Sequence, residues 1–120
     1  SQLFVISDQF DFASHDQLTM GYVDTLHRHA FGNYRDLLRD VTLHPAMGMY
    51  LAMLGNEKSD PERNIRPDEN FAREVMQLFT VGLQLLNQDG SPILDEATSL
   101  PRQTYSPVDV QNYAAALTGW

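Results

Sequence analysis

The sequence predicts an all-α protein, an orthogonally packed bundle of about five helices with one small β-hairpin between the fourth and fifth. Apolar residues recur at steps of three and four through most of the chain, the spacing of a helix that buries one face. A capping residue or a proline begins each such stretch, and a glycine ends most of them. A strand-like pattern with a turn signal occurs once, after the fourth stretch.

The first two predicted helices follow one another closely. A capping box of Ser14 and Gln17 begins the first, and Gly32 ends it. Asn33 caps the second. Their buried stripes are expected at Leu18, Tyr22, Leu26 and Ala30, and at Tyr34, Leu37, Leu38 and Val41.

The third and fourth predicted helices flank a charged segment. Pro45 suits the first position of the third helix, which Gly55 ends. Residues 56–67 carry one apolar side chain besides their prolines and are expected to form a surface loop. Asp68 caps the fourth helix, which Gly82 ends. The buried stripes are expected at Met47, Tyr50, Leu51 and Leu54, and at Phe71, Val75, Leu78 and Phe79.

A hairpin is predicted over residues 83–94, with a turn at Asn87–Gly90 and with Pro92 confining its second arm to an edge. After a loop, Ser106 and Asp109 form a second capping box and begin the fifth helix. Its stripe is expected at Val110, Tyr113, Ala114 and Leu117, with Gly119 as its end.

The length of 120 residues suits a single domain, residues 1–120. The apolar opening Gln2–Ser7 suggests the last turns of a helix, and Trp120 is a large apolar last residue. We therefore expect this chain to be a fragment of a larger helical protein.

The charge balance limits the classes of partner. Eight Lys and Arg face sixteen Asp and Glu, and the net charge of −8 argues against binding to nucleic acid or anionic lipid, which require a basic surface. No apolar run approaches the roughly 20 residues that a membrane span needs. The absence of cysteine excludes thiolate metal sites, cysteine nucleophiles and disulfides.

Metal and cofactor sites are not expected. A zinc site would need two histidines one helical turn apart, but His27 and His29 point to different sides of a helix, and His15 and His44 lie far from them in sequence. The segment 85–96 can be aligned with a calcium loop, but Leu85 would occupy the first ligand position, and a hairpin turn explains the same residues.

Catalytic motifs for a nucleophile or a phosphate loop are also absent. The acidic pairs Asp8 with Asp11, and Asp95 with Glu96, could act in acid-base chemistry only at a suitable distance in space, which the sequence does not define.

A basic patch precedes and enters the second predicted helix, at His27, Arg28, His29, Arg35 and Arg39. It could bind an anion near the start of that helix. The favoured alternative is pairing of the arginines with Asp36, Asp40 or neighbouring helices.

Four polar side chains share one face of the fourth predicted helix: Asn70, Arg73, Glu74 and Gln77. They fall within about 100° of arc on a helical wheel. This face either meets water, with Glu69 paired to Arg73 and Asn70 to Glu74, or it recognises another molecule.

The run from Asn70 to Gly82, the segment Tyr105–Val110 and the ending Ala115–Trp120 resemble a bacterial family catalogued as "domain of unknown function 1800". Residues 28–38, 44–47 and 1–7 are similar to it as well. The resemblance implies a mostly helical protein of several hundred residues that is exported from bacteria, and therefore a periplasmic or extracellular location. It implies no established activity and no catalytic residues.

Two functions follow as hypotheses. The first is a binding or assembly module, in which the polar face holds a protein partner or the remainder of the full-length chain. The second is part of a hydrolase-like enzyme completed by segments outside residues 1–120, with Glu74 as acid or base, Arg73 as an anion clamp and a histidine nearby.

Overall fold

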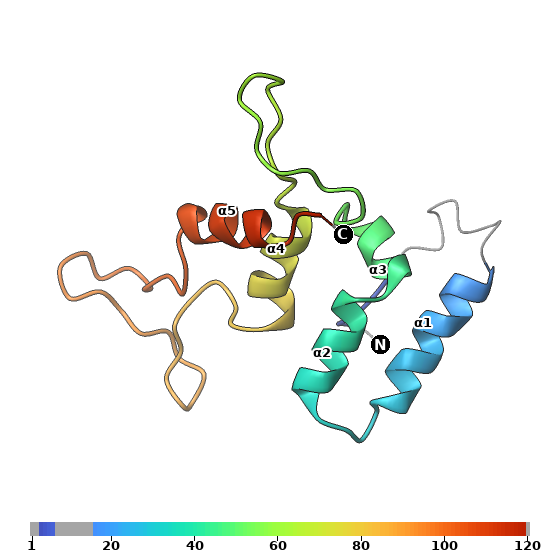
Figure 1. The fold of residues 1–120 in the computed structure, drawn as a ribbon. Helices are drawn as coiled ribbons and strands as arrows, with labels where there is room; N and C mark the ends of the chain where they lie inside the picture. Colours follow the sequence, from blue (N-terminus) through green and yellow to red (C-terminus); the bar gives the residue numbers. More distant parts are fainter. Residues whose placement is uncertain (1–2, 7–15, 120) are drawn as a thin grey trace.

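A computed structural model describes residues 3–6 and 16–119, and these residues form an all-α structure (Figure 1). The helices are α1 (Asp16–Arg28), α2 (Tyr34–Thr42), α3 (Pro45–Tyr50), α4 (Asn70–Glu74) and α5 (Pro107–Ala116), and a π-helical turn, η2 (Val75–Phe79), continues α4. In this part of the chain, no helix has the length and apolar character required to cross a bilayer. The features predicted at Ser14, His15, Asp8, Asp11 and Trp120 lie outside the described residues.

Local capping interactions define the helix starts that the sequence predicts. The side chain of Asn33 accepts a hydrogen bond from the amide two residues further on, at 2.8 Å. Ser106 and Asp109 form the predicted capping box of α5. The Asp68 carboxylate accepts the Asn70 N–H at 2.8 Å, so it satisfies an amide of the first turn of α4. The predicted starts at Asn33 and Ser106 are confirmed. In α4 the N-cap is Glu69, one residue after the predicted Asp68.

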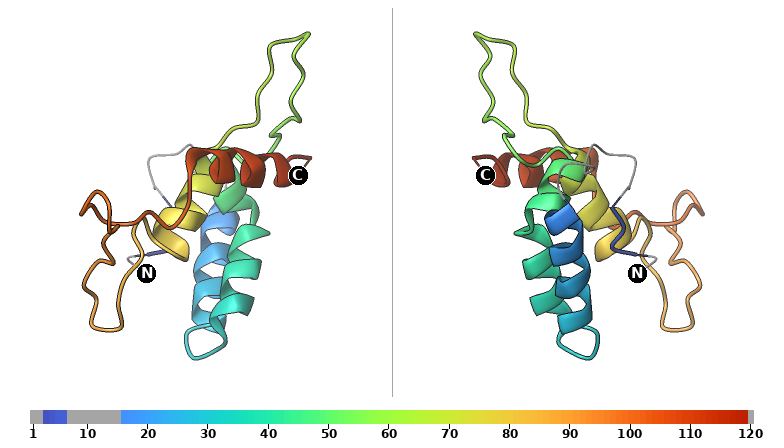
Figure 2. Two further views of the ribbon diagram at one scale, coloured as in Figure 1. Left: turned by 90° about the vertical axis from the view of Figure 1, so that its left-hand side faces the viewer. Right: turned by 90° about the vertical axis from the view of Figure 1, so that its right-hand side faces the viewer.

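The helices fall into two groups. α1 and α2 lie side by side and antiparallel, with α3 packed against both, while α4 packs against α5. α5 crosses the direction of α1 and α2 in both views of Figure 2. α5 therefore packs on α4 and runs across the direction of α1 and α2, whereas α1 and α2 pair lengthwise.

The third helix is shorter than predicted. It ends at Tyr50 instead of Gly55, because the chain turns at Ala52, whose φ is +56°. The amides of Met53 and Leu54 both donate to the Gly48 carbonyl at 2.9 Å. Leu54 is exposed as a result, although the helical spacing predicts its burial.

The opening segment is not the end of a helix, and that prediction is wrong for its described part. Residues 3–6 form no regular element. Phe4 points into the core and is only 3% exposed, while Leu3 and Val5 on either side of it are exposed. The apolar character of this segment therefore supplies the buried Phe4 to the core, and Ile6 packs against the same cluster.

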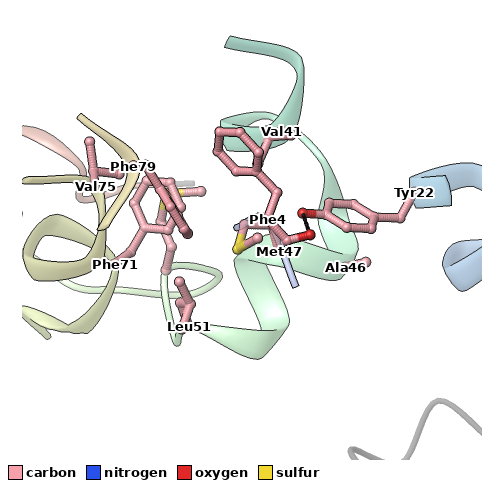
Figure 3. Packing of buried hydrophobic residues seen from close by; sticks show 10 residues of the cluster. Phe4, Tyr22, Val41, Ala46, Met47, Leu51, Phe71, Val75 and Phe79 are labelled. Carbon is pink, nitrogen blue, oxygen red and sulfur yellow. Dashed lines mark hydrogen bonds between the residues drawn. The ribbon is translucent and has the colours of Figure 1, made fainter. Parts of the chain in front are cut away.

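Phe4 lies between the two helix groups in the main core (Figure 3). Its ring centroid is 4.8 Å from that of Phe79 and 5.9 Å from that of Tyr34, and its carbonyl accepts the Tyr22 hydroxyl at 3.1 Å. The buried residues of this cluster are Phe4, Tyr22, Val41, Ala46, Met47, Leu51, Met53, Phe71, Val75 and Phe79. A smaller cluster joins α4 to α5 through Ala72, Val110 and Ala114.

The predicted β-hairpin is wrong as a regular element. The turn is present, since the Gly90 amide donates to the Asn87 carbonyl at 3.0 Å and Gly90 has a φ of +84°. The backbone pairs around it are isolated bridges, and the described residues form no sheet. The amide of Ile93 donates to Leu85, that of Arg102 to Ile93, and that of Leu85 to Arg102, at 2.8, 2.8 and 2.9 Å. Three segments thus close on one another in a ring, and this prevents a two-stranded ladder.

Two long loops extend from the helices. Residues 56–67 project on one side and residues 83–105 on another (Figure 1). The radius of gyration of the chain is 16.8 Å, against about 13.6 Å for a compact domain of this length. The loop predicted over residues 56–67 is confirmed, and the two loops leave much of the chain outside the core.

Candidate functional site

The polar residues predicted on the fourth helix lie on α4 and η2, and they differ in their surroundings. Asn70 and Arg73 are exposed, whereas Glu74 and Gln77 are half-buried. Arg73 pairs with Glu69 at 2.7 Å, as the spacing of four residues allows. The second pair considered from the sequence, Asn70 with Glu74, is not among the hydrogen bonds of the described residues.

The π-helical turn changes which side chains this helix buries. The helical spacing of 3.6 residues predicts that Leu78 is buried, but it is 53% exposed, whereas Phe79 is buried. A π-helical turn is wider than an α-helical one, and it shifts the residues that follow around the axis. The Thr80 hydroxyl donates to the Val75 carbonyl at 2.7 Å, and the Gly82 amide donates to the Met76 carbonyl at 2.9 Å. These bonds hold the end of the turn.

The displaced Leu78 lies at the edge of a groove of about 340 Å³. Three segments form it: the opening segment, the end of α3, and α4 with η2. Its apolar residues are Leu3, Val5, Tyr50, Leu51, Leu78 and Phe79, and its polar residues are Asn70 and Glu74. Among the described residues of this lining, Glu74 is the one that carries a charge, and we call the concavity the Glu74 groove.

Three aromatic residues, of which Phe4 and Phe79 are buried and Tyr34 is exposed, fix the walls of the Glu74 groove. The Tyr34 hydroxyl donates a hydrogen bond to the Phe79 carbonyl, which joins α2 to the end of η2. Phe4 packs on Phe79 and holds Leu3 and Val5 at the opposite wall. The sequence analysis missed Phe4 and Tyr34 as residues that shape this groove. The uninterrupted apolar run Leu3–Ile6 was the available signal for Phe4, and nothing local marks Tyr34.

Arg73 is separated from this groove. It lines a different cavity of about 260 Å³, together with Gln84, Gln103 and Tyr105 from the long loop. Gln77 lines neither of the two cavities. The structure thus brings Asn70 and Glu74 together and places Arg73 elsewhere, so an acid or base at Glu74 and an anion clamp at Arg73 do not share one cavity.

The histidines have other roles. His29 Nε2 lies 2.7 Å from the Asp40 carboxylate, and this hydrogen bond lowers the pKa of Asp40. His44 Nδ1 accepts the Ala46 N–H at 3.2 Å and so caps α3. Burial lowers the pKa of His44. Neither histidine lines the Glu74 groove. Asp40, a predicted partner of the patch arginines, pairs with His29 of the same patch.

The acidic residues of the long loop serve its turns. One Asp89 oxygen accepts the amide and the hydroxyl of Ser91 at 2.9 and 2.6 Å. One Asp95 oxygen accepts the amides of Ala97 and Thr98 at 3.1 and 2.9 Å. Across residues 3–6 and 16–119, no three His, Asp or Glu side chains gather as a metal site would require.

Comparison with known proteins gives one match. A family model described as "Protein of unknown function (DUF1800)" matches residues 1–120. No curated protein and no solved structure matches the chain.

Proposed function

Because the chain belongs to the DUF1800 family, whose description assigns no activity, we propose from its own surface that it is a helical binding or assembly module. Its binding site is the Glu74 groove. The observation that carries this proposal is the exposure of Leu3, Val5 and Leu78 around one concavity. Apolar side chains gathered in a concave site are typical of surfaces that bind another molecule.

The π-helical turn supports the same conclusion. Such turns occur frequently at functional sites, where they direct side chains that a regular helix would place elsewhere. Here the turn exposes Leu78, and burial of a leucine side chain contributes about 1.5–3 kcal/mol. Stability of the isolated chain does not explain that exposure, whereas contact with a bound segment does.

The bound segment belongs either to a partner or to another part of a longer chain. By the resemblance of the sequence to an exported bacterial family, we further propose a periplasmic or extracellular location. Cell fractionation of the producing bacterium tests it, and recovery of the protein in the cytoplasm alone would contradict it.

Thiol labelling tests the binding proposal, because residues 1–120 contain no cysteine. Leu78→Cys is compared with Glu62→Cys, an exposed position in the loop over residues 56–67. In the protein isolated from cells with its partners or remaining segments, we expect maleimide to react with Leu78→Cys at least tenfold more slowly. Mass spectrometry locates the label. Equal rates at the two positions would refute the proposed function.

A further inference from the structure

We infer that the Glu74 groove binds a short apolar peptide segment that carries one lysine or arginine, whose cationic group pairs with Glu74. This inference rests on the proposed function and adds the chemistry of the partner. Leu3, Val5 and Leu78 supply exposed apolar contacts, and Glu74 supplies the single charge of the lining.

The burial and the ion pairing of Glu74 indicate the charge of the bound segment. Its side chain is half-buried, and no cation pairs with it among residues 3–6 and 16–119. The nearest candidate along the helix, Arg73, is bound to Glu69 at 2.7 Å and lines the other cavity. A bound segment that covered this carboxylate with apolar groups alone would remove it from water without compensation, which is costly. A cation on the segment avoids that cost.

Asn70 adds a second polar contact in the same groove. Its side chain offers both a donor and an acceptor, which can bind the backbone of a peptide. One charge, one amide and several apolar side chains together suit a peptide better than a small ion.

The charge of the chain favours a basic occupant over a second copy of itself. Two chains of net charge −8 repel one another, whereas the acidic chain attracts a basic segment before the two are in contact. The exposed leucines of the long loop, Leu94 among them, are accompanied by Asp95 and Glu96. Those acids would approach Glu74 if the loop of another copy entered the groove.

A phage-displayed library of random 12-residue peptides, selected on the immobilised protein, tests the inference. We expect the selected peptides to combine apolar residues with a lysine or arginine. Their affinity should fall about tenfold or more in Leu78→Ser, since an apolar contact is lost. It should fall on the order of tenfold in Glu74→Gln, since a charge-assisted hydrogen bond is lost.

Matched variants separate local from general effects. Glu62→Gln removes the same charge from the exposed loop and should leave the affinity unchanged. Glu74→Lys should select acidic peptides in place of basic ones. Added salt should weaken binding to the unmodified protein more than to Glu74→Gln.

The outcomes distinguish the two proposals. Peptides that depend on Leu78 but lack a basic residue, or that bind Glu74→Gln equally well, would overturn this inference and leave the proposed function standing. A concentration-dependent dimer of the chain that Leu78→Ser abolishes would overturn it in favour of a second copy. Failure to select any peptide that depends on Leu78 would count against both.

Discussion

Replacing Phe4 with alanine should destabilise the whole molecule, although this residue belongs to a segment without regular structure. Phe4 is 3% exposed and contacts the rings of Phe79 and Tyr34, at centroid distances of 4.8 and 5.9 Å. It lies between the two helix groups (Figure 3). The substitution therefore opens a cavity at their junction.

The expected magnitude follows from the buried ring. Truncation of a buried phenylalanine to alanine costs about 3–5 kcal/mol, because transfer energy is lost and a cavity remains. A domain of this size has a free energy of unfolding of about 5–15 kcal/mol. We therefore expect Phe4→Ala to remove about a fifth or more of the stability. Phe4→Leu keeps most of the volume and should cost less than about 1.5 kcal/mol.

Urea unfolding followed by circular dichroism measures this effect. Val5→Ala is the matched control, because Val5 is the next residue and is 46% exposed. The control should change the free energy of unfolding by less than about 1 kcal/mol. If Phe4→Ala costs no more than Val5→Ala, the opening segment does not hold the helix groups together, and the reasoning is refuted.

Three further predictions concern polar contacts. The Asn56 side chain forms two hydrogen bonds with the backbone of Asp68, at 2.7 and 3.1 Å. The variant Asn56→Ala should therefore lower the free energy of unfolding in urea by about 1–2 kcal/mol. An unchanged urea midpoint would contradict this prediction. Burial lowers the pKa of His44, so the unfolded state binds a proton on this histidine more readily, and the free energy of unfolding falls as the pH drops below 6.5. The variant His44→Asn keeps a capping side chain and should reduce this fall when unfolding is measured over a pH series. An identical pH profile in the variant would refute the prediction. The hydrogen bond with His29 lowers the pKa of Asp40, so this pair stabilises the fold above the ordinary carboxyl pKa, and that stabilisation is lost as the pH falls through the lowered pKa. The variant Asp40→Asn should remove this loss from the melting temperatures measured at acid pH. Unchanged melting temperatures in the acid range would contradict the prediction.

The helix starts could be predicted because capping is local. Asn33 and Asp68 each bond to an amide two residues away, and Ser106 bonds within its own turn. The all-α class followed from the spacing of apolar residues for a similar reason. Such signals need no knowledge of the rest of the fold.

The errors arose where distant segments decide the structure. Leu85 accepts the Ile93 N–H across the predicted hairpin, but its own amide donates to Arg102, 17 positions further on, so the pairing does not continue as a two-stranded ladder. Phe4 contacts residues of α1, α2 and η2, and an apolar run alone does not reveal such distant contacts. Helical spacing also assumes a constant turn, and the π-helical turn at Val75–Phe79 breaks that assumption.

For the same reason, only Asn70 and Glu74 of the candidate groove could be predicted as site residues. A helical wheel groups Asn70 with Glu74, and the structure places both at one concavity. The wheel also includes Arg73, because it cannot show that the long loop forms a second cavity on that side. The apolar wall opposite Glu74 comes from Leu3 and Val5, some 70 residues away along the chain.

The proposed occupancy of the groove accounts both for the exposure of Leu78 and for a Glu74 that has no ion-pair partner in the part of the chain that the structure describes. In the chain without a bound segment, the Leu78 side chain is exposed to solvent, and the Glu74 carboxylate lies in a largely apolar lining. Neither arrangement stabilises the isolated chain. A bound apolar segment with one cation would bury the Leu78 side chain and pair with the Glu74 carboxylate in the same contact. One binding event therefore accounts for both features of this helix.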